Sequence, residues 1–208
     1  MVPRIVIYDP ALTVGLPAKV SGPSGMNALA HCVEALYAED ASPIAALLAA
    51  EGIRALANAL PVVVAEGENI EARGEALYGA WFAGTALATA SMGIHHKLCH
   101  ALGASFNLPH AEVHAVILPH ATAYNREAAP AAMRTIAQAL GAKDAAQGLY
   151  DLAKRLGAPL ALKDIGMPEE GLDKAAQLAC DSPYRNPRPV EVAAVRQLLD
   201  DAYRGKRP

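Results

Sequence analysis

Apolar positions three and four residues apart recur along most of the chain, and this spacing predicts helices. The first predicted helix covers residues 26–39. Residues 42–60 open with an N-cap serine and a proline at the first helical position, and they predict a second helix that ends or bends at Pro61. Residues 69–90 predict a third helix, whose small residues on one side suit close packing against a neighbour.

A histidine-rich helix, a loop and another helix follow in the middle of the chain. Residues 95–104 predict the helix, residues 105–109 form a loop that contains proline, and the next helix begins near His110. The same periodicity then predicts four further helices, over residues 129–140, 144–156, 169–180 and 189–205.

One segment at the start of the chain has a different pattern. Residues 4–10, RIVIYDP, are a short β-branched run closed by Asp-Pro, which predicts a strand and a turn. A strand must pair its backbone groups with a neighbour, and the later sequence offers no obvious partner strand. We therefore predict one mainly α-helical domain over residues 1–208, in which residues 1–20 are a strand and linker that lead into the helical body. The strands that pair with it would therefore belong to a larger protein or assembly of which this chain is a part.

Composition adds constraints on the core and the surroundings. The chain has 208 residues, of which 53% are apolar, but only two Phe and one Trp, so Ala, Leu, Val and Ile must build the core. A net charge of −3 gives no reason to expect nucleic acid or an anionic membrane as a partner. We expect no membrane span and no targeting segment. Three scattered cysteines fit a reducing compartment, so we expect a cytoplasmic protein.

Candidate chemistry is concentrated in the histidines. Five of the seven lie within residues 93–114, His120 follows closely, and His31 is far upstream. Histidine is a common metal ligand and can carry a proton near neutral pH. A single histidine is more often a satisfied structural residue than a ligand. The count alone therefore leaves a metal site, a proton-transfer site and a solvated helix face open.

Helical spacing groups some of these side chains. Residues four apart share one face of a helix, which pairs His96 with His100 and Asn27 with His31. His110 follows a loop and stands near the start of the next helix. Two helix faces and one loop-to-helix junction could therefore bring four heteroatoms around one point.

In three segments the chain resembles the C-terminal domain of the iron-containing (group III) alcohol dehydrogenases. The segments are GMNALAHCVEALY, HHKLCHALGASFNLPHAEVHAVILPHATAYN and NPRPV. Within that superfamily they are most similar to the maleylacetate reductases. The resemblance covers nearly the whole chain. It implies the helical-bundle C-terminal domain of the dehydroquinate synthase-like, iron-containing alcohol dehydrogenase fold, with a short strand at its start.

The resemblance assigns roles by position. Metal-dependent members of the family hold Fe²⁺ or Zn²⁺ with an Asp, a His four residues later and two further histidines. In this sequence those positions are Asn27, His31, His96 and His110. His100 matches a histidine that faces the substrate and the nicotinamide and is not a metal ligand. In such enzymes the metal polarises the alcohol or carbonyl oxygen while hydride moves to or from the cofactor.

Asn27 departs from the metal-dependent pattern. An amide oxygen does not offset the charge of a divalent cation, so three imidazoles and one amide should hold Fe²⁺ or Zn²⁺ weakly. The same replacement is typical of maleylacetate reductases, which are generally thought to work without the metal. The resemblance therefore implies reduction of maleylacetate to 3-oxoadipate by NADH or NADPH.

For this reaction the histidines would serve the substrate instead of a metal. We expect His100 to be the proton donor or its neighbour. We expect His31, His96 and His110 to surround the carboxylate or enolate oxygen of a doubly anionic keto acid.

Other residues have simpler expected roles. His95 points about 100° away from His96 around the helix axis and should be structural. His114 and His120 should lie at a helix surface or a helix end. Arg185 and Arg188, within YRNPRPV, fit a turn before the last helix, although they could bind an anion.

The sequence contains no glycine-rich turn after a strand that could bind the pyrophosphate of a nicotinamide cofactor. In the family an N-terminal α/β domain has that role, so the resemblance implies a nucleotide-binding half that is absent from these 208 residues. We expect it as a separate domain or subunit, in a homo- or hetero-oligomer. Two alternatives stay open. One is a metal-dependent alcohol dehydrogenase domain that tolerates Asn27, and the other is a non-catalytic helical subunit retained for assembly.

Overall fold

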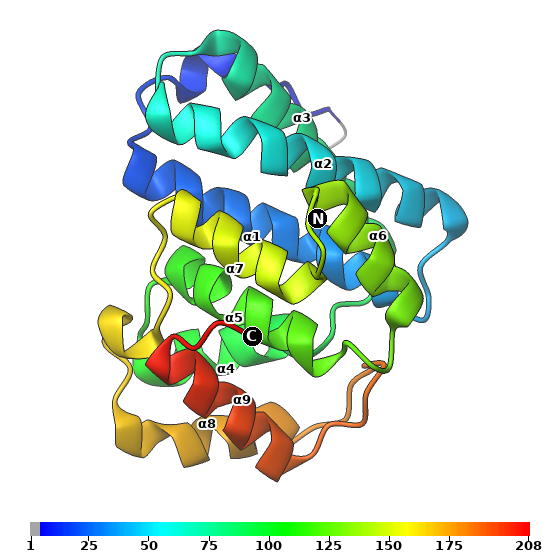
Figure 1. Ribbon diagram of the computed structural model, residues 1–208, viewed down its shortest axis with the longest axis vertical. Coiled ribbons are helices and arrows are strands. Elements are labelled where there is room, and N and C mark those ends of the chain that lie inside the picture. The colour runs from blue at the N-terminus through cyan, green and yellow to red at the C-terminus, as the bar shows by residue number, and fades with distance from the viewer. Residues whose placement is uncertain (1–4) are drawn as a thin grey trace.

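The computed structural model describes residues 5–208, and the regular elements within them are helices (Figure 1). The predicted mainly α-helical fold is therefore confirmed. The α-helices are α1 (Ala18–Tyr37), α2 (Pro43–Ala65), α3 (Ile70–Thr89), α4 (Ile94–Phe106), α5 (His110–Tyr124), α6 (Pro130–Leu140), α7 (Ala145–Arg155), α8 (Leu172–Cys180) and α9 (Val192–Arg204). Short 3₁₀ turns are η1 (Pro10–Thr13), η2 (Leu162–Ile165) and η3 (Glu169–Gly171).

Local capping chemistry sets several of the helix starts. The Ser42 hydroxyl accepts a hydrogen bond from the Ala45 amide at 3.1 Å, and Pro43 follows at the first helical position of α2. Asn69 and Asp144 cap α3 and α7 in the same way. These starts agree with the prediction because a cap acts within a single turn of the chain.

Two of the prolines inside helices correct the predicted boundaries. α1 begins at Ala18, eight residues before the predicted start at residue 26, and it includes Pro23. α2 continues through Pro61 to Ala65. A proline inside a helix removes one backbone hydrogen bond. In α1 the residues around the proline are buried, so tertiary packing offsets that loss.

The predicted strand at the start of the chain is wrong for the residues that the structure describes. Residues 5–9 have no regular structure, and the side chains of Ile5 and Ile7 are 82% and 85% exposed. β-branched residues favour a strand only where a neighbouring backbone pairs with them. The described part of the chain has no strand beside this segment. Residues 1–4, which include the first residue of the predicted strand, lie outside the described residues.

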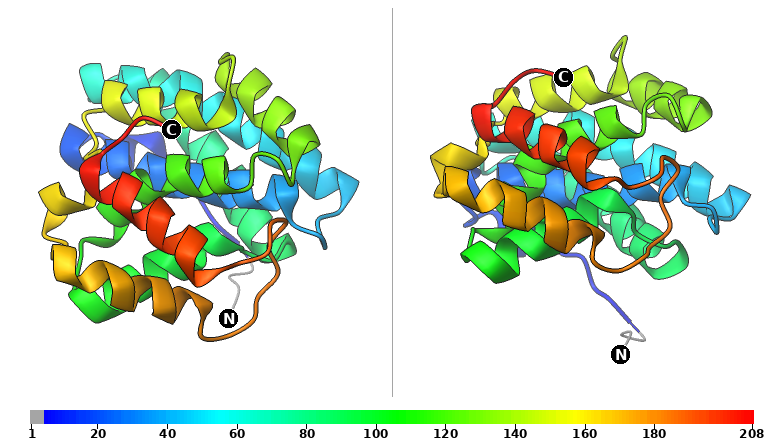
Figure 2. Two further views of the ribbon diagram at one scale, coloured as in Figure 1. Left: turned by 60° about the horizontal axis from the view of Figure 1, so that its bottom comes forward. Right: turned by 90° about the horizontal axis from the view of Figure 1, so that it is seen from below.

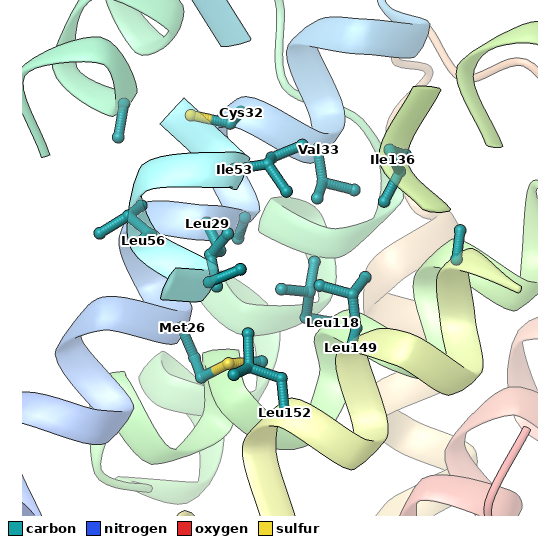
Figure 3. Close-up of a cluster of buried hydrophobic side chains, with 14 of the residues drawn as sticks. Met26, Leu29, Cys32, Val33, Ile53, Leu56, Leu118, Ile136, Leu149 and Leu152 are labelled. Carbon is teal, nitrogen blue, oxygen red and sulfur yellow. The ribbon is translucent and has the colours of Figure 1, made fainter. Parts of the chain in front are cut away.

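Two hydrophobic cores hold the helices together. The first lies among α1, α2, α6 and α7, and Figure 3 shows its side chains, which include Leu29, Ile53 and Leu149. The second lies among α4, α5, α8 and α9, in the lower half of Figure 1. Figure 2 shows α8 and α9 side by side there. α5 contributes Leu118 to the first core and Ile117 to the second, so it is buried on nearly all sides and joins the two.

α2 is long and apolar enough, by length and composition alone, to cross a membrane. In the structure it packs against α1, α3 and α6, and half of its apolar window is buried inside the protein. A core helix of a bundle has the same composition. Packing within the protein therefore accounts for the apolar character of α2.

Small residues let α1, α2 and α3 approach closely. On α3 a Cβ atom added at Gly79 would lie 2.6 Å from Leu56 Cγ of α2, as the small residues within 69–90 predict. A Cβ atom added at Gly52 of α2 would lie 2.7 Å from Cys32 Sγ of α1 and 2.9 Å from Phe82 Cβ of α3. A Cβ atom added at Gly84 of α3 would meet no atom within 4 Å. The junction of the three helices therefore depends on the absence of a side chain at position 52.

We expect Gly52→Ala to lower the free energy of unfolding by about 1–3 kcal/mol, because the added methyl group overpacks this junction. The matched variant Gly84→Ala should raise it by up to about 1 kcal/mol, because alanine is the better helix former and has room at this position. Urea unfolding followed by circular dichroism measures both effects. Equal effects of the two substitutions would contradict the packing described for the three helices.

Candidate active site

The predicted histidines come together where α1 passes the first turns of α4 and α5. The ring centroids of His31 and His96 are 4.6 Å apart, and those of His96 and His100 are 6.3 Å apart. His110 reaches the same cluster through His114, whose ring centroid lies 4.4 Å from that of His110 and 5.1 Å from that of His96. The structure thus gathers the four predicted histidines into one histidine cluster, while their roles stay predictions.

The histidine cluster extends from the interior to the surface. His96 is buried, with 7% of its surface exposed. Asn27 and His31 are half-buried, whereas His100 and His110 are exposed. A substrate could therefore reach the cluster from the side of His100 and His110.

Two buried atoms at the predicted ligand positions have no hydrogen-bond partner among the described residues. They are the Oδ1 atom of Asn27 and the Nε2 atom of His96. Buried polar atoms are normally paired. A group bound at either atom would therefore complete its hydrogen bonding.

Glu34 contacts the cluster through His96 and was not among the predicted site residues. Its fully buried carboxylate accepts hydrogen bonds from the backbone amides of Gly93 at 2.9 Å, His95 at 3.0 Å and His96 at 3.3 Å. It also contacts His96 Nδ1 at 2.7 Å and accepts a hydrogen bond from the Tyr37 hydroxyl at 3.0 Å. The available signal was a single acidic residue within the apolar helical stretch of α1.

His95, Cys99 and His114 form a second, buried group beside the cluster. His95 Nε2 lies 2.9 Å from His114 Nδ1 and 3.6 Å from Cys99 Sγ, and one ligand-type atom from each residue lies within 4.8 Å of the others. Burial raises the pKa of the Cys99 thiol well above its ordinary value, which keeps the thiol protonated. We therefore interpret the group as hydrogen-bonded support for the cluster. The prediction that His114 lies at a helix surface or end is wrong, because α5 is buried on nearly all sides.

Burial keeps several of these rings uncharged. It lowers the pKa of His31 to about 4, with a further lowering by His96 and an opposing effect of Glu34. Burial also lowers the pKa of His114 to about 2, and it lowers the pKa of His100. A neutral imidazole binds an anion through its N–H group and not through a positive charge.

The NPRPV segment fixes the start of α4. The Asn186 Oδ1 atom accepts hydrogen bonds from the Ile94 amide at 3.3 Å and from the Asn125 side chain at 3.0 Å. The Arg188 guanidinium lies 4.2 Å from the centre of the Tyr124 ring. These contacts support the interpretation of the segment as a structural turn before the last helix.

His120 lies outside the histidine cluster, near the end of α5, and only 4% of its surface is exposed. Burial lowers the pKa of this ring from 6.5 to about 4. As the pH falls, the unfolded chain therefore binds a proton at this residue before the folded chain does.

Known proteins match both the sequence and the structure. The family profile described as the C-terminal part of the Fe-containing alcohol dehydrogenase family matches residues 22–203. The maleylacetate reductase of Burkholderia cepacia is 55% identical over all 208 residues, which cover 59% of that protein. The chain thus spans about three fifths of the length of the curated relatives that it matches.

Solved structures have the same helical arrangement. The maleylacetate reductase from Rhizobium sp. strain MTP-10005 matches with a TM-score of 0.97 at 52% identity, over 100% of this chain and 59% of that chain. The sulfoacetaldehyde reductase from Bifidobacterium kashiwanohense in complex with NAD⁺ matches with a TM-score of 0.84 at 25% identity, over 94% of this chain and 53% of that chain. The match to the helical part of these proteins supports the family fold that the sequence implies.

We expect the chain to lose stability as the pH falls from 6.5 to about 4, because protonation of His120 favours the unfolded state in this range. A His120→Leu variant should lose up to about 3 kcal/mol less of its unfolding free energy across the same range. Urea unfolding at about pH 7 and about pH 4.5 measures this difference. His100→Gln serves as the control, since the exposed His100 ring is solvated and should contribute less. The same pH dependence in His120→Leu as in the parent chain would rule out this origin.

Proposed function

Because the chain belongs to the iron-containing alcohol dehydrogenase family, we propose that it forms the helical half of a reductase of the maleylacetate reductase type. Its substrate is a keto-dicarboxylate, and the leading case is reduction of maleylacetate to 3-oxoadipate by NADH or NADPH. The arrangement of the histidine cluster carries the proposal. His100 lies at its exposed side, the His96 Nε2 atom is buried without a partner among the described residues, and so is the Oδ1 atom of Asn27, one helical turn before His31.

The residues of this chain supply hydrogen bonds and a proton for the reaction. The reduced nicotinamide, when bound by the nucleotide-binding half, supplies hydride to the carbon–carbon double bond that is conjugated to the ketone. The developing enolate oxygen needs hydrogen-bond donors, which the N–H groups of His31 and His110 provide. His100 then protonates the enolate carbon, because its exposed ring can take up a proton from solvent and pass it to the substrate.

The second candidate is a metal-dependent alcohol dehydrogenase, because the unpartnered Asn27 Oδ1 and His96 Nε2 atoms are also possible metal ligands. With His31 and His110 they would form the family's ligand set, and a bound Fe²⁺ or Zn²⁺ would polarise a substrate oxygen. All four ligands are uncharged when they bind, so none of them offsets the charge of the cation. We therefore favour reduction without a metal.

A nucleotide-binding half is the partner that this proposal requires. Ile5, Ile7 and Leu12 expose most of their apolar surface, and η1 packs against α3, where Tyr78 and Trp81 are also exposed. An extended apolar surface of this kind is typical of a protein interface. We propose that the nucleotide-binding half docks on the surface formed by η1 and α3, in a cytoplasmic oligomer.

The chain alone should bind NADH weakly and reduce maleylacetate slowly, whereas a fusion to the N-terminal part of a maleylacetate reductase should be active. In that fusion His100→Gln should lower kcat by about 10²–10⁴-fold with a smaller effect on KM, because a lost proton donor acts on the chemical step. Consumption of NADH, followed by absorbance, measures both constants.

Lys97→Gln is the matched control on the same helix, because the Lys97 ammonium binds the Ser182 hydroxyl at 2.7 Å, outside the histidine cluster. Rapid turnover of maleylacetate by the chain alone would contradict the proposal that a separate half binds the nicotinamide cofactor. Equal kcat values for the His100→Gln fusion and its parent would show that His100 is not the proton donor.

Asn27→Asp should raise the affinity of the chain for Zn²⁺ by about tenfold or more, because a carboxylate adds negative charge at the ligand position. Isothermal titration calorimetry measures the affinity, and His96→Ala in the Asn27→Asp background should remove the gain. Near-stoichiometric Fe or Zn in the parent chain purified without chelator, lost in His96→Ala, would favour the metal-dependent candidate instead.

A further inference from the structure

The contacts of Glu34 define its charge. Its Oε1 atom accepts the amide of His95, and its Oε2 atom accepts the amides of Gly93 and His96. Backbone N–H groups can only donate, so both carboxyl oxygens of Glu34 act as acceptors. Donors therefore surround both oxygens, an arrangement that stabilises the ionised carboxylate over the protonated form. The positive end of the α4 dipole and the hydrogen bond donated by the Tyr37 hydroxyl stabilise the negative charge of the carboxylate.

This charge determines where His96 carries its proton. An ionised carboxylate has no proton to donate, so the 2.7 Å contact between Glu34 Oε2 and His96 Nδ1 requires Nδ1 to be the donor. A neutral imidazole has a single N–H group, and its other nitrogen then carries a lone pair. In His96 that nitrogen is Nε2, which is buried without a partner among the described residues.

We propose that Glu34 is a positioning residue, which holds the proton of neutral His96 on Nδ1 and presents Nε2 to the bound ligand as an electron-pair donor. The proposal rests on the proposed function only in treating His96 as a site residue. The proposal gives the histidines of the cluster two different binding roles. His96 binds a group that offers an O–H or a positive charge, and His31 and His110 are the N–H donors for anionic oxygens.

The same contact supplies negative charge that Asn27 lacks. A carboxylate behind an imidazole orients the ring and makes its far nitrogen a stronger base, although the carboxylate does not touch the ligand. Glu34 thus places a negative charge one ring away from the unpartnered Nε2 atom of His96. An uncharged residue at position 27 is therefore compatible with an electron-donating site.

A purely structural role for Glu34 would be limited to capping α4, whose first amides it satisfies. A residue that only caps a helix affects stability and does not determine which ring nitrogen of His96 carries the proton. The tautomer of His96 therefore separates a positioning role from a structural one.

The first test measures this tautomer in the unaltered chain. Two-bond ¹H–¹⁵N correlations of the ¹⁵N-labelled chain, recorded at about pH 8 where free imidazole is neutral, distinguish protonated from unprotonated ring nitrogens. We expect His96, assigned by the loss of its signals in His96→Gln, to be protonated at Nδ1 and unprotonated at Nε2. Protonation of neutral His96 at Nε2 would overturn the proposal.

The second test removes the charge of Glu34. Glu34→Gln should convert His96 to a mixture of tautomers, because an amide can turn its NH₂ group toward Nδ1. In the Asn27→Asp background it should also weaken Zn²⁺ binding by about 10–100-fold, as expected for loss of a carboxylate behind a ligand. Isothermal titration calorimetry measures the affinity.

Tyr37→Phe is the matched control, because it removes one hydrogen bond to Glu34 and leaves the contact with His96 in place. It should change neither the tautomer nor the Zn²⁺ affinity appreciably. A folded Glu34→Gln variant with the parent tautomer and the parent affinity would refute the positioning role. If Glu34→Gln does not fold, the His96 tautomer measured in the unaltered chain alone supports or refutes the positioning role of Glu34. An inactive fusion enzyme would contradict the proposed function and leave these two measurements unchanged.

Discussion

The hydrogen bonds of Glu34 join α1, which carries Asn27 and His31, to the first turn of α4. The two helices belong to different hydrophobic cores, since α1 packs in the first and α4 in the second. A buried charge without hydrogen-bond donors is strongly destabilising, so the start of α4 must meet α1 at this carboxylate. One satisfied charge therefore fixes the start of α4 against α1 and helps to set the distance between the site residues of the two helices.

The absence of charge on His31 and His114 lets many imidazoles share a small volume. Neighbouring ring centroids lie 4.4 Å apart for His110 and His114 and 4.6 Å apart for His31 and His96. Several positive charges at this spacing would repel one another. Burial, together with this repulsion, lowers the pKa of His31 and His114. The cluster consequently presents N–H groups and lone pairs, and the direction of each hydrogen bond decides what it binds.

Caps and periodicity predicted most of the helices, because a cap such as Ser42 acts within one turn. The first turns of α1 escaped prediction because Pro23 breaks a local rule and only contacts with distant helices stabilise that segment. The predicted strand failed for the converse reason, since residues 5–9 have strand propensity and no partner. In the site, helical spacing grouped the histidines. Glu34 has the sequence of an ordinary helical glutamate, and its burial depends on a helix that begins 60 residues later. The burial of His114 was missed because a histidine in a helix is usually at the surface, whereas α5 is buried on nearly all sides by both cores.

α5 makes the histidine cluster dependent on both cores. It contributes Leu118 to one core and Ile117 to the other, and its first two turns carry His110 and His114. A shift in the packing of either core would therefore move these two rings relative to His96, which Glu34 fixes from the other side. Contacts from both cores and from Glu34 thus hold the described part of the cluster in place.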